Sequence, residues 1–176
     1  MDLDRLEEWS LPRFSWDYDH LSLSEHWFRM ACAYLDCSHH LLEAMIEERL
    51  ASSFHHAKVA VAIFEHAVEL FLKGAIAHAD QSVPVHHKST ELLSQYRKLY
   101  PGKEFGFSGE IDQAVSQTEA TPRNQYARYP QDLGGRPWPG HTHIDLSLWY
   151  RQVRCFKEDF DRLWPLIRVK HRGVGP

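Results

Sequence analysis

Residues Phe54 to His78 read FHHAKVAVAIFEHAVELFLKGAIAH, and this stretch decides the fold class of the chain. Its apolar side chains recur at alternating spacings of three and four, which is typical of an apolar helix face. One apolar line consists of Phe54, Ala57, Val61, Phe64, Val68, Phe71 and Ala75, and the line beside it consists of Ala60, Ile63, Ala67, Leu70 and Gly74. A helix that is apolar on two faces must be covered by several neighbours, so the stretch predicts the central helix of a bundle. Its His, Glu and Lys side chains are too frequent for a membrane span.

The bulk composition indicates one globular domain. Of the 176 residues, 43% are hydrophobic and 25% are charged, values that argue against a disordered protein. The formal net charge of -4 excludes a global basic field for nucleic acid, although it leaves room for a local basic patch. Cys32, Cys37 and Cys155 lack a paired metal or redox spacing, and no secretory signal opens the sequence. We therefore expect reduced thiols in a cytoplasmic protein, without a membrane partner.

The thirteen histidines are the unusual feature of the composition. Several stand in close pairs, namely His39-His40, His55-His56, His86-His87 and His141 with His143. Neighbouring residues on a helix point about 100° apart, so a doublet seldom supplies two ligands to one ion. We interpret these histidines as surface and cap residues and predict no metal site. The alternative is a metal-binding helical bundle that uses scattered histidines.

The remaining sequence predicts further helices that cover the central one. The predicted helices run from Ser24 to about Leu50, from Phe54 to about Asp80, from Glu91 to Leu99, from about Glu110 onward, and from Leu146 to about Ile167. Residues 130-143, rich in glycine and proline, predict a long loop before the last helix. No segment alternates like a strand, so the predicted fold is an all-α, antiparallel bundle of four to five helices. We expect residues 1-23 to form an arm packed on the bundle, residues 24-170 the helical domain, and residues 171-176 a flexible tail.

The most distinctive polar stretch supplies most of the candidate site residues, which are Arg123, Asn124, Tyr126, Arg128 and Tyr129. In a phosphate or nucleotide cleft, the arginines would pair with phosphate oxygens while one tyrosine stacks on a base. The alternative is structural: the arginines would bridge carboxylates such as Glu65, Glu69 or Glu119, and the tyrosines would cover the core.

Glu69 and Lys73 are further ligand-binding candidates, because charges are few on the central helix. Their spacing of four, with Glu first, is also that of the preferred ion pair on a helix surface, which contributes only a few tenths of a kcal/mol. Both interpretations stay open at this stage.

The order of these features resembles the HEPN-domain superfamily. The segment Glu65 to Gly74, EHAVELFLKG, resembles the second HEPN helix, and HHKSTELL, residues 86-93, is similar to the short helix that follows it. The stretch RNQYARYP, residues 123-130, stands where many members carry an R-N-x-x-x-H element. The resemblance spans roughly Ser24 to Pro165. It implies an antiparallel, usually dimeric bundle. Many members are metal-independent ribonucleases whose Arg and His from two subunits meet in a cleft, and others bind nucleotides or act with a nucleotidyltransferase partner in toxin–antitoxin pairs.

The sequence departs from the ribonuclease pattern where the histidine is required, because Arg128 and Tyr129 stand there. An arginine stays protonated, so it holds phosphate but is a poor proton shuttle. We therefore expect a non-catalytic, homodimeric module that binds a nucleotide or RNA phosphate, or a nucleotidyltransferase-type partner of a toxin–antitoxin or defence system, with no cofactor. The alternative is a metal-independent endoribonuclease with a non-standard site, in which Arg123 and Arg128 are the catalytic candidates and His141, His143 or a histidine of the second subunit moves the proton.

Overall fold

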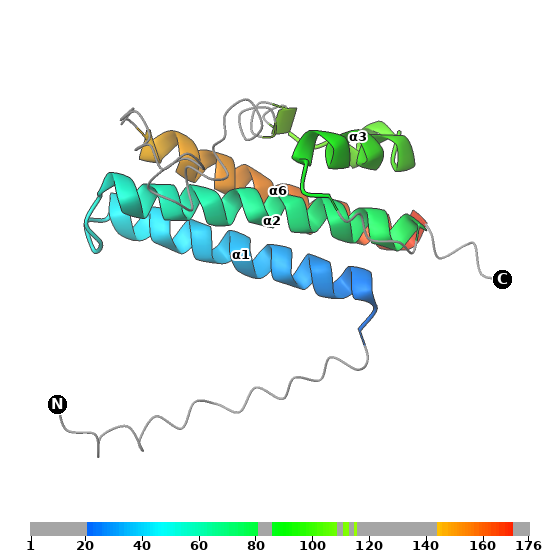
Figure 1. Cartoon of the computed structure of the whole chain (residues 1–176), viewed down its shortest axis with the longest axis horizontal. Helices are drawn as coiled ribbons and strands as arrows, with labels where there is room; N and C mark the ends of the chain where they lie inside the picture. The colour runs from blue at the N-terminus through cyan, green and yellow to red at the C-terminus, as the bar shows by residue number, and fades with distance from the viewer. Residues whose placement is uncertain (1–20, 81–85, 109–110, 113–114, 116–143, 171–176) are drawn as a thin grey trace, which may run out of the picture.

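The described part of the chain is helical and contains no β-strand. The computed structural model describes residues 21-80, 86-108, 111, 112, 115 and 144-170. Its elements are α1 (Leu23–Ile46), α2 (Phe54–Asp80), α3 (Ser89–Leu99), the short 3-10 helix η3 (Lys103–Phe105) and α6 (Leu146–Lys170). Figure 1 shows the four α-helices packed side by side as a bundle. The predicted all-α bundle is confirmed.

Helix α2 lies at the centre of this bundle, as the apolar lines of the sequence predict. It contacts α1, α3 and α6, and Figure 1 shows it running between α1 and the other two. Every residue from Ala67 to Ala77 is buried. This part of α2 therefore has no solvent-facing side, and even its polar residues must be accommodated by their neighbours.

A short turn, residues 47-53, reverses the chain between α1 and α2. Glu48 has a positive φ of 58°, which lets the backbone turn sharply after α1. Ser53 then caps α2, since its Oγ accepts a hydrogen bond from His56 N at 3.3 Å. The predicted break before the central helix is confirmed, but α1 ends at Ile46 and not near Leu50.

Helix α6 covers α1 and α2 with aromatic side chains. Its Phe160 stacks on Phe71 of α2 with ring centroids 4.1 Å apart, and its Trp164 stacks on Phe28 of α1 at 4.4 Å. Other apolar residues of α6, such as Phe156 and Leu163, are also buried in the core, whereas Leu148 is 38% exposed. The helix also continues through Pro165 to Lys170, beyond the predicted end at Ile167.

Tyrosine side chains attach α3 to the bundle. Tyr100 Oη donates a hydrogen bond of 2.8 Å to the carbonyl of Ala75 in α2, and Tyr96 Oη donates one of 2.8 Å to the carbonyl of Phe105 in η3. Arg162 of α6 donates to the carbonyls of Glu104 and Gly106. The connection after α3 is therefore held between two helices.

Several predicted boundaries change or lie outside the described residues. Helix α1 begins at Leu23, before the predicted Ser24, and its N-cap is Ser22, whose Oγ accepts a hydrogen bond from Glu25 N. Helix α3 begins at Ser89, before the predicted Glu91. Residues 1-20 of the expected arm, the loop 130-143 and the tail 171-176 lie outside the described residues. Within the described part of the chain, no helix is long and apolar enough to cross a membrane.

A substitution at Gly74 tests how closely α1 approaches α2. A Cβ at this position would lie 3.1 Å from Trp27 Cβ and 3.2 Å from the carbonyl oxygen of Ser24, which is backbone. Alanine favours a helix interior by about 1 kcal/mol over glycine, yet the shift of α1 that it requires costs 1–3 kcal/mol. We expect Gly74→Ala to lower the free energy of unfolding by about 1 kcal/mol and Gly74→Val to lower it further, measured by urea denaturation. A more stable Gly74→Ala variant would show that the helices are not in tight contact here.

Candidate functional site

The structure describes two of the seven predicted ligand-binding residues, Glu69 and Lys73. The other five, together with His141 and His143, lie outside the described residues; these five are Arg123, Asn124, Tyr126, Arg128 and Tyr129. The cleft predicted around Arg123 and Arg128 stays a prediction. Two sites can be built from the described residues: a charged cluster on α2 and a groove along α3.

The charged cluster begins with Glu69 and Lys73, one helical turn apart on α2. Lys73 Nζ lies 3.0 Å from Glu69 Oε1, and the exposed fractions of the two side chains are 4% and 10%. The ammonium also lies 5.7 Å from the ring centroid of Trp27 on α1, a cation–π contact. The interpretation of this pair as a helix-surface ion pair is therefore wrong: both charges are buried.

Two histidines complete the cluster. His87, in the segment before α3, has its Nδ1 2.7 Å from Glu69 Oε1. His66 Nδ1 lies 3.8 Å from the other carboxylate oxygen, an ion contact too long for a direct hydrogen bond. Burial by itself raises the pKa of Glu69, but the neighbouring His66, Lys73 and His87 outweigh it and lower this pKa to about 2. Glu69 is consequently an ionised carboxylate at neutral pH.

Glu69 orients the His87 ring. A carboxylate only accepts hydrogen bonds, so Nδ1 donates the proton of the 2.7 Å contact, whereas Lys73 Nζ lies farther from the same Nδ1, at 3.5 Å. A neutral His87 ring with its proton on Nδ1 has Nε2 as its acceptor. The His87 side chain is 74% exposed, whereas Glu69 is almost covered. A buried carboxylate that orients an accessible imidazole can support proton transfer to and from a bound molecule.

Sequence reasoning did not select His87 as a site residue. The signal available was the doublet His86-His87 at the point where the HEPN resemblance places a histidine before a short helix. Its partner Glu69 lies 18 residues earlier, so only the tertiary structure joins the two groups.

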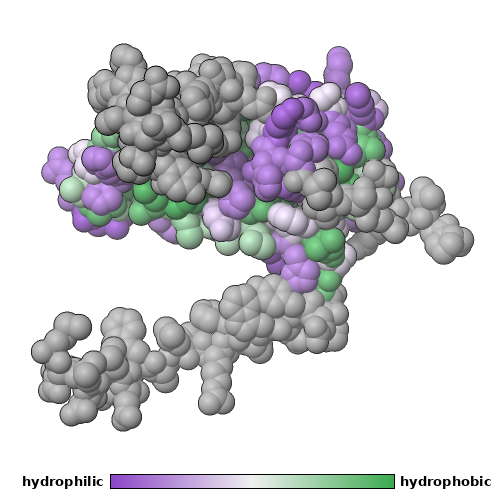
Figure 2. Space-filling view, in the orientation of Figure 1, coloured by the Kyte–Doolittle hydropathy of each residue, from purple (hydrophilic) through white to green (hydrophobic). Residues whose placement is uncertain are grey.

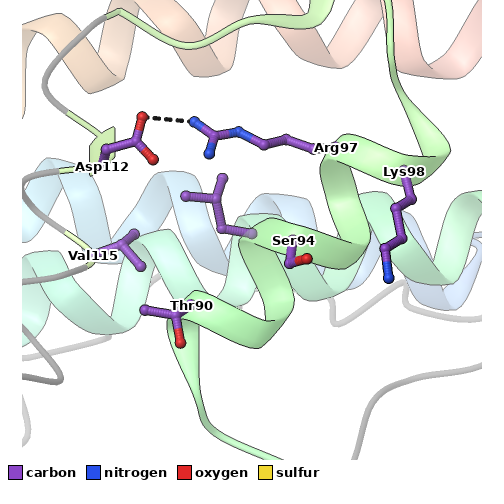
Figure 3. A pocket seen from close by; sticks show the side chains of 7 residues that line it. Thr90, Ser94, Arg97, Lys98, Asp112 and Val115 are labelled. Atoms are coloured by element: carbon purple, nitrogen blue, oxygen red, sulfur yellow. Dashed lines mark hydrogen bonds and ion pairs between the residues drawn. The ribbon is translucent and has the colours of Figure 1, made fainter.

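The second site is a groove of about 750 Å³ beside α3. It is lined by Thr90, Leu93, Ser94, Arg97, Lys98, Asp112 and Val115. Figure 3 shows Thr90, Ser94 and Lys98 along one side of α3, while Arg97 reaches across to Asp112. Figure 2 shows that hydrophilic residues gather over this part of the molecule.

An exposed ion pair borders the groove. Arg97 Nη2 donates a hydrogen bond of 2.7 Å to Asp112 Oδ2, and the two side chains are 52% and 63% exposed. This hydrogen bond lowers the pKa of Asp112. Pairs so open to water contribute little to stability, so Arg97 can exchange its partner at small cost. Two cations and one carboxylate give the groove a formal charge of +1.

The sequence indicates only part of this groove. Ser94 and Lys98 are four positions apart, which aligns them on one face of the predicted helix, but Thr90 precedes its predicted start and Asp112 and Val115 come from a later segment. The comparisons add no relative: no protein-family model, curated protein or solved structure matches this chain.

Replacing Glu69 tests the charged cluster through its effect on stability. Glu69→Gln leaves Lys73 buried without its counter-charge, so we expect a loss of about 2–3 kcal/mol in the free energy of unfolding at pH 7, measured by urea denaturation. The surface pair of Arg154 and Glu158, 3.9 Å apart with exposed fractions of 59% and 75%, provides the control. Glu158→Gln should change the free energy by less than about 0.5 kcal/mol.

The lowered pKa of Glu69 predicts how the difference in stability between the unsubstituted protein and Glu69→Gln depends on pH. The pKa of Glu69 is lowered in the folded protein from 4.5 to about 2, so its ionised form stabilises the fold fully above pH 4.5. That contribution is lost as the pH falls from 4.5 toward 2. The stability gap between the unsubstituted protein and Glu69→Gln should therefore shrink over this range. A gap that is constant with pH would contradict the lowered pKa.

Proposed function

We propose that this protein is a non-catalytic binding module that holds a nucleotide or an RNA phosphate in the groove beside α3. The observation that carries the proposal is the alignment of two hydroxyls and two cations along α3, at the edge of a groove large enough for a nucleotide. Thr90 and Ser94 supply the hydroxyls, and Arg97 and Lys98 the cations.

The chemistry of the lining suits a phosphorylated ligand. A phosphate can take over Arg97 from Asp112, since guanidinium binds phosphate in a bidentate manner and Asp112 returns to water. Lys98 adds a second charge, and the hydroxyls can donate to phosphate oxygens. Leu93 and Val115 give the groove an apolar floor, against which a base or sugar can pack.

The HEPN resemblance supports the same proposal. The all-α bundle agrees with the fold that this resemblance implies. Val115 lines the groove, and the sequence then reaches Arg123 in eight residues, which allows the predicted arginines to extend the same binding surface. Within this proposal the module is a homodimer that serves a nucleotidyltransferase-type partner in a toxin–antitoxin or defence system.

Three variants test phosphate binding with effects of opposite sign. Labelled single-stranded RNA is titrated in EDTA and followed by fluorescence anisotropy, with ATP as competitor. We expect Arg97→Ala and Lys98→Ala to weaken binding about 5- to 30-fold and to reduce the salt slope by about 0.7 per lost phosphate contact. Asp112→Asn removes a competing carboxylate, so it should strengthen binding.

The matched control is Arg154→Ala, which removes an exposed arginine from α6, away from the lining of the groove. It should bind RNA and ATP like the unsubstituted protein. Equal affinities for all four variants, or no binding of either ligand, would refute the α3 groove as the site.

A second candidate function, metal-independent RNA cleavage, is supported by the Glu69–His87 arrangement. His87 Nε2 would accept the proton of the 2′-hydroxyl, whose oxygen attacks phosphorus to form a cyclic phosphate while the 5′-oxygen leaves and takes up a proton. This hypothesis assigns the proton transfer to His87 instead of His141, His143 or a histidine of a second subunit.

Replacing His87 separates the two candidate functions. If the protein cleaves labelled RNA in EDTA, His87→Ala should reduce the cleavage rate about 10²- to 10³-fold, because general base catalysis contributes that much. The control is His86→Ala, at the adjacent position. Intact RNA combined with binding would favour the non-catalytic module, and equal cleavage by both variants would exclude His87 as the base.

A further inference from the structure

A histidine–carboxylate cluster stands on the C-terminal half of α1, apart from both sites above. One ring nitrogen each of His39 and His40 and one carboxylate oxygen of Glu43 lie within 4.8 Å of one another. Glu43 Oε2 is 3.6 Å from His40 Nδ1. Among the described residues, this is the only group of three or more such side chains close enough to share an ion.

The helix brings these groups together through Glu43. Glu43 follows His39 by four positions and His40 by three, so the Glu43 carboxylate can reach both rings. The two ring centroids are 5.8 Å apart, although neighbouring residues on a helix start about 100° apart. The doublet His39-His40 is therefore close enough to supply two ligands to one ion, which is expected only seldom of a doublet on a helix.

The environment prepares His39 as a ligand. The ring of Tyr150 on α6 packs against it at a centroid distance of 4.9 Å, which restricts its rotation. Its Nδ1 is buried and, within the described part of the chain, has no hydrogen-bond partner. Burial, followed by the charge of Lys157, lowers the pKa of His39.

We propose that His39, His40 and Glu43 form a binding site for a divalent transition-metal ion such as Zn²⁺ or Ni²⁺. Imidazole nitrogens with a carboxylate oxygen are a usual ligand set for such ions, and water completes the coordination. This site is independent of the nucleotide groove proposed above.

The ligands need only a small adjustment to bind one ion. Bonds of 2.0–2.1 Å place tetrahedral ligands about 3.4 Å apart. The His40 side chain is 73% exposed and can rotate toward Glu43, which is 30% exposed. Arg49 also pairs with Glu43, at 3.9 Å from Oε2, but it lies closer to Glu47, at 2.7 Å, so Glu43 can turn from Arg49 to an ion while Arg49 keeps Glu47. Lys157 pairs with Asp36.

The test is a calorimetric titration of Zn²⁺ into the full chain, produced without a histidine tag and freed of metal. We expect a binding step that is at least tenfold weaker in His39→Ala and in Glu43→Gln. The control is His55→Ala, which removes an exposed histidine of another doublet and should leave the affinity unchanged within twofold. Circular dichroism checks that each variant is helical.

A second measurement guards against loss of folding in His39→Ala. Zn²⁺ should raise the melting temperature of the unsubstituted protein and of His55→Ala, and this rise should disappear in Glu43→Gln, which keeps the size and shape of the side chain. The proposal is overturned if the unsubstituted protein binds no Zn²⁺, or if His39→Ala and Glu43→Gln bind it like the unsubstituted protein.

Discussion

The buried ion pair of Glu69 and Lys73 is the constraint on which the arrangement around α2 depends. Both charges lie in the stretch Ala67 to Ala77, which is buried throughout, so water cannot solvate them. A buried charge without a partner costs several kcal/mol. The neighbours must therefore supply the missing contacts: Trp27 of α1 lies against the ammonium, and His87 binds the carboxylate. The segment before α3 consequently has to return to α2.

The helices around this pair are held by different forces. Contact between α6 and α2 is largely aromatic, with Phe160 stacked on Phe71, whereas Tyr100, directly after α3, makes a directional hydrogen bond to the backbone of α2. A short helix with an apolar inner face and a few directional contacts keeps its outer face available. In α3 that outer face carries the hydroxyls and cations of the groove, so the mode of attachment determines where a ligand can approach.

Periodicity predicts the helices because burial of a helix face is a local pattern, and α2 and α6 follow it closely. The start of α1 depends on tertiary contacts: Ser24, where the sequence predicts that the helix begins, hydrogen-bonds to His78 of α2, while Ser22 caps the helix. The Glu69–Lys73 spacing is the same in a buried pair and in an exposed one. Local sequence therefore identifies the pair but neither its burial nor its link to His87.

The ion pairs Glu69–Lys73 in α2 and Arg97–Asp112 beside α3 have similar N–O distances, 3.0 and 2.7 Å. They differ in whether an external anion can replace the carboxylate. Removing Glu69 from Lys73 would leave a charge in the core, so no external anion can take that place without opening the bundle. Arg97 and Asp112 are already solvated, and exchanging one anion for another there costs little. His87 lies between these extremes, since its Nδ1 is bound to a buried carboxylate while most of its ring is exposed. The buried ion pair thus constrains the packing around α2, whereas Arg97, Asp112 and His87 stay accessible to solvent.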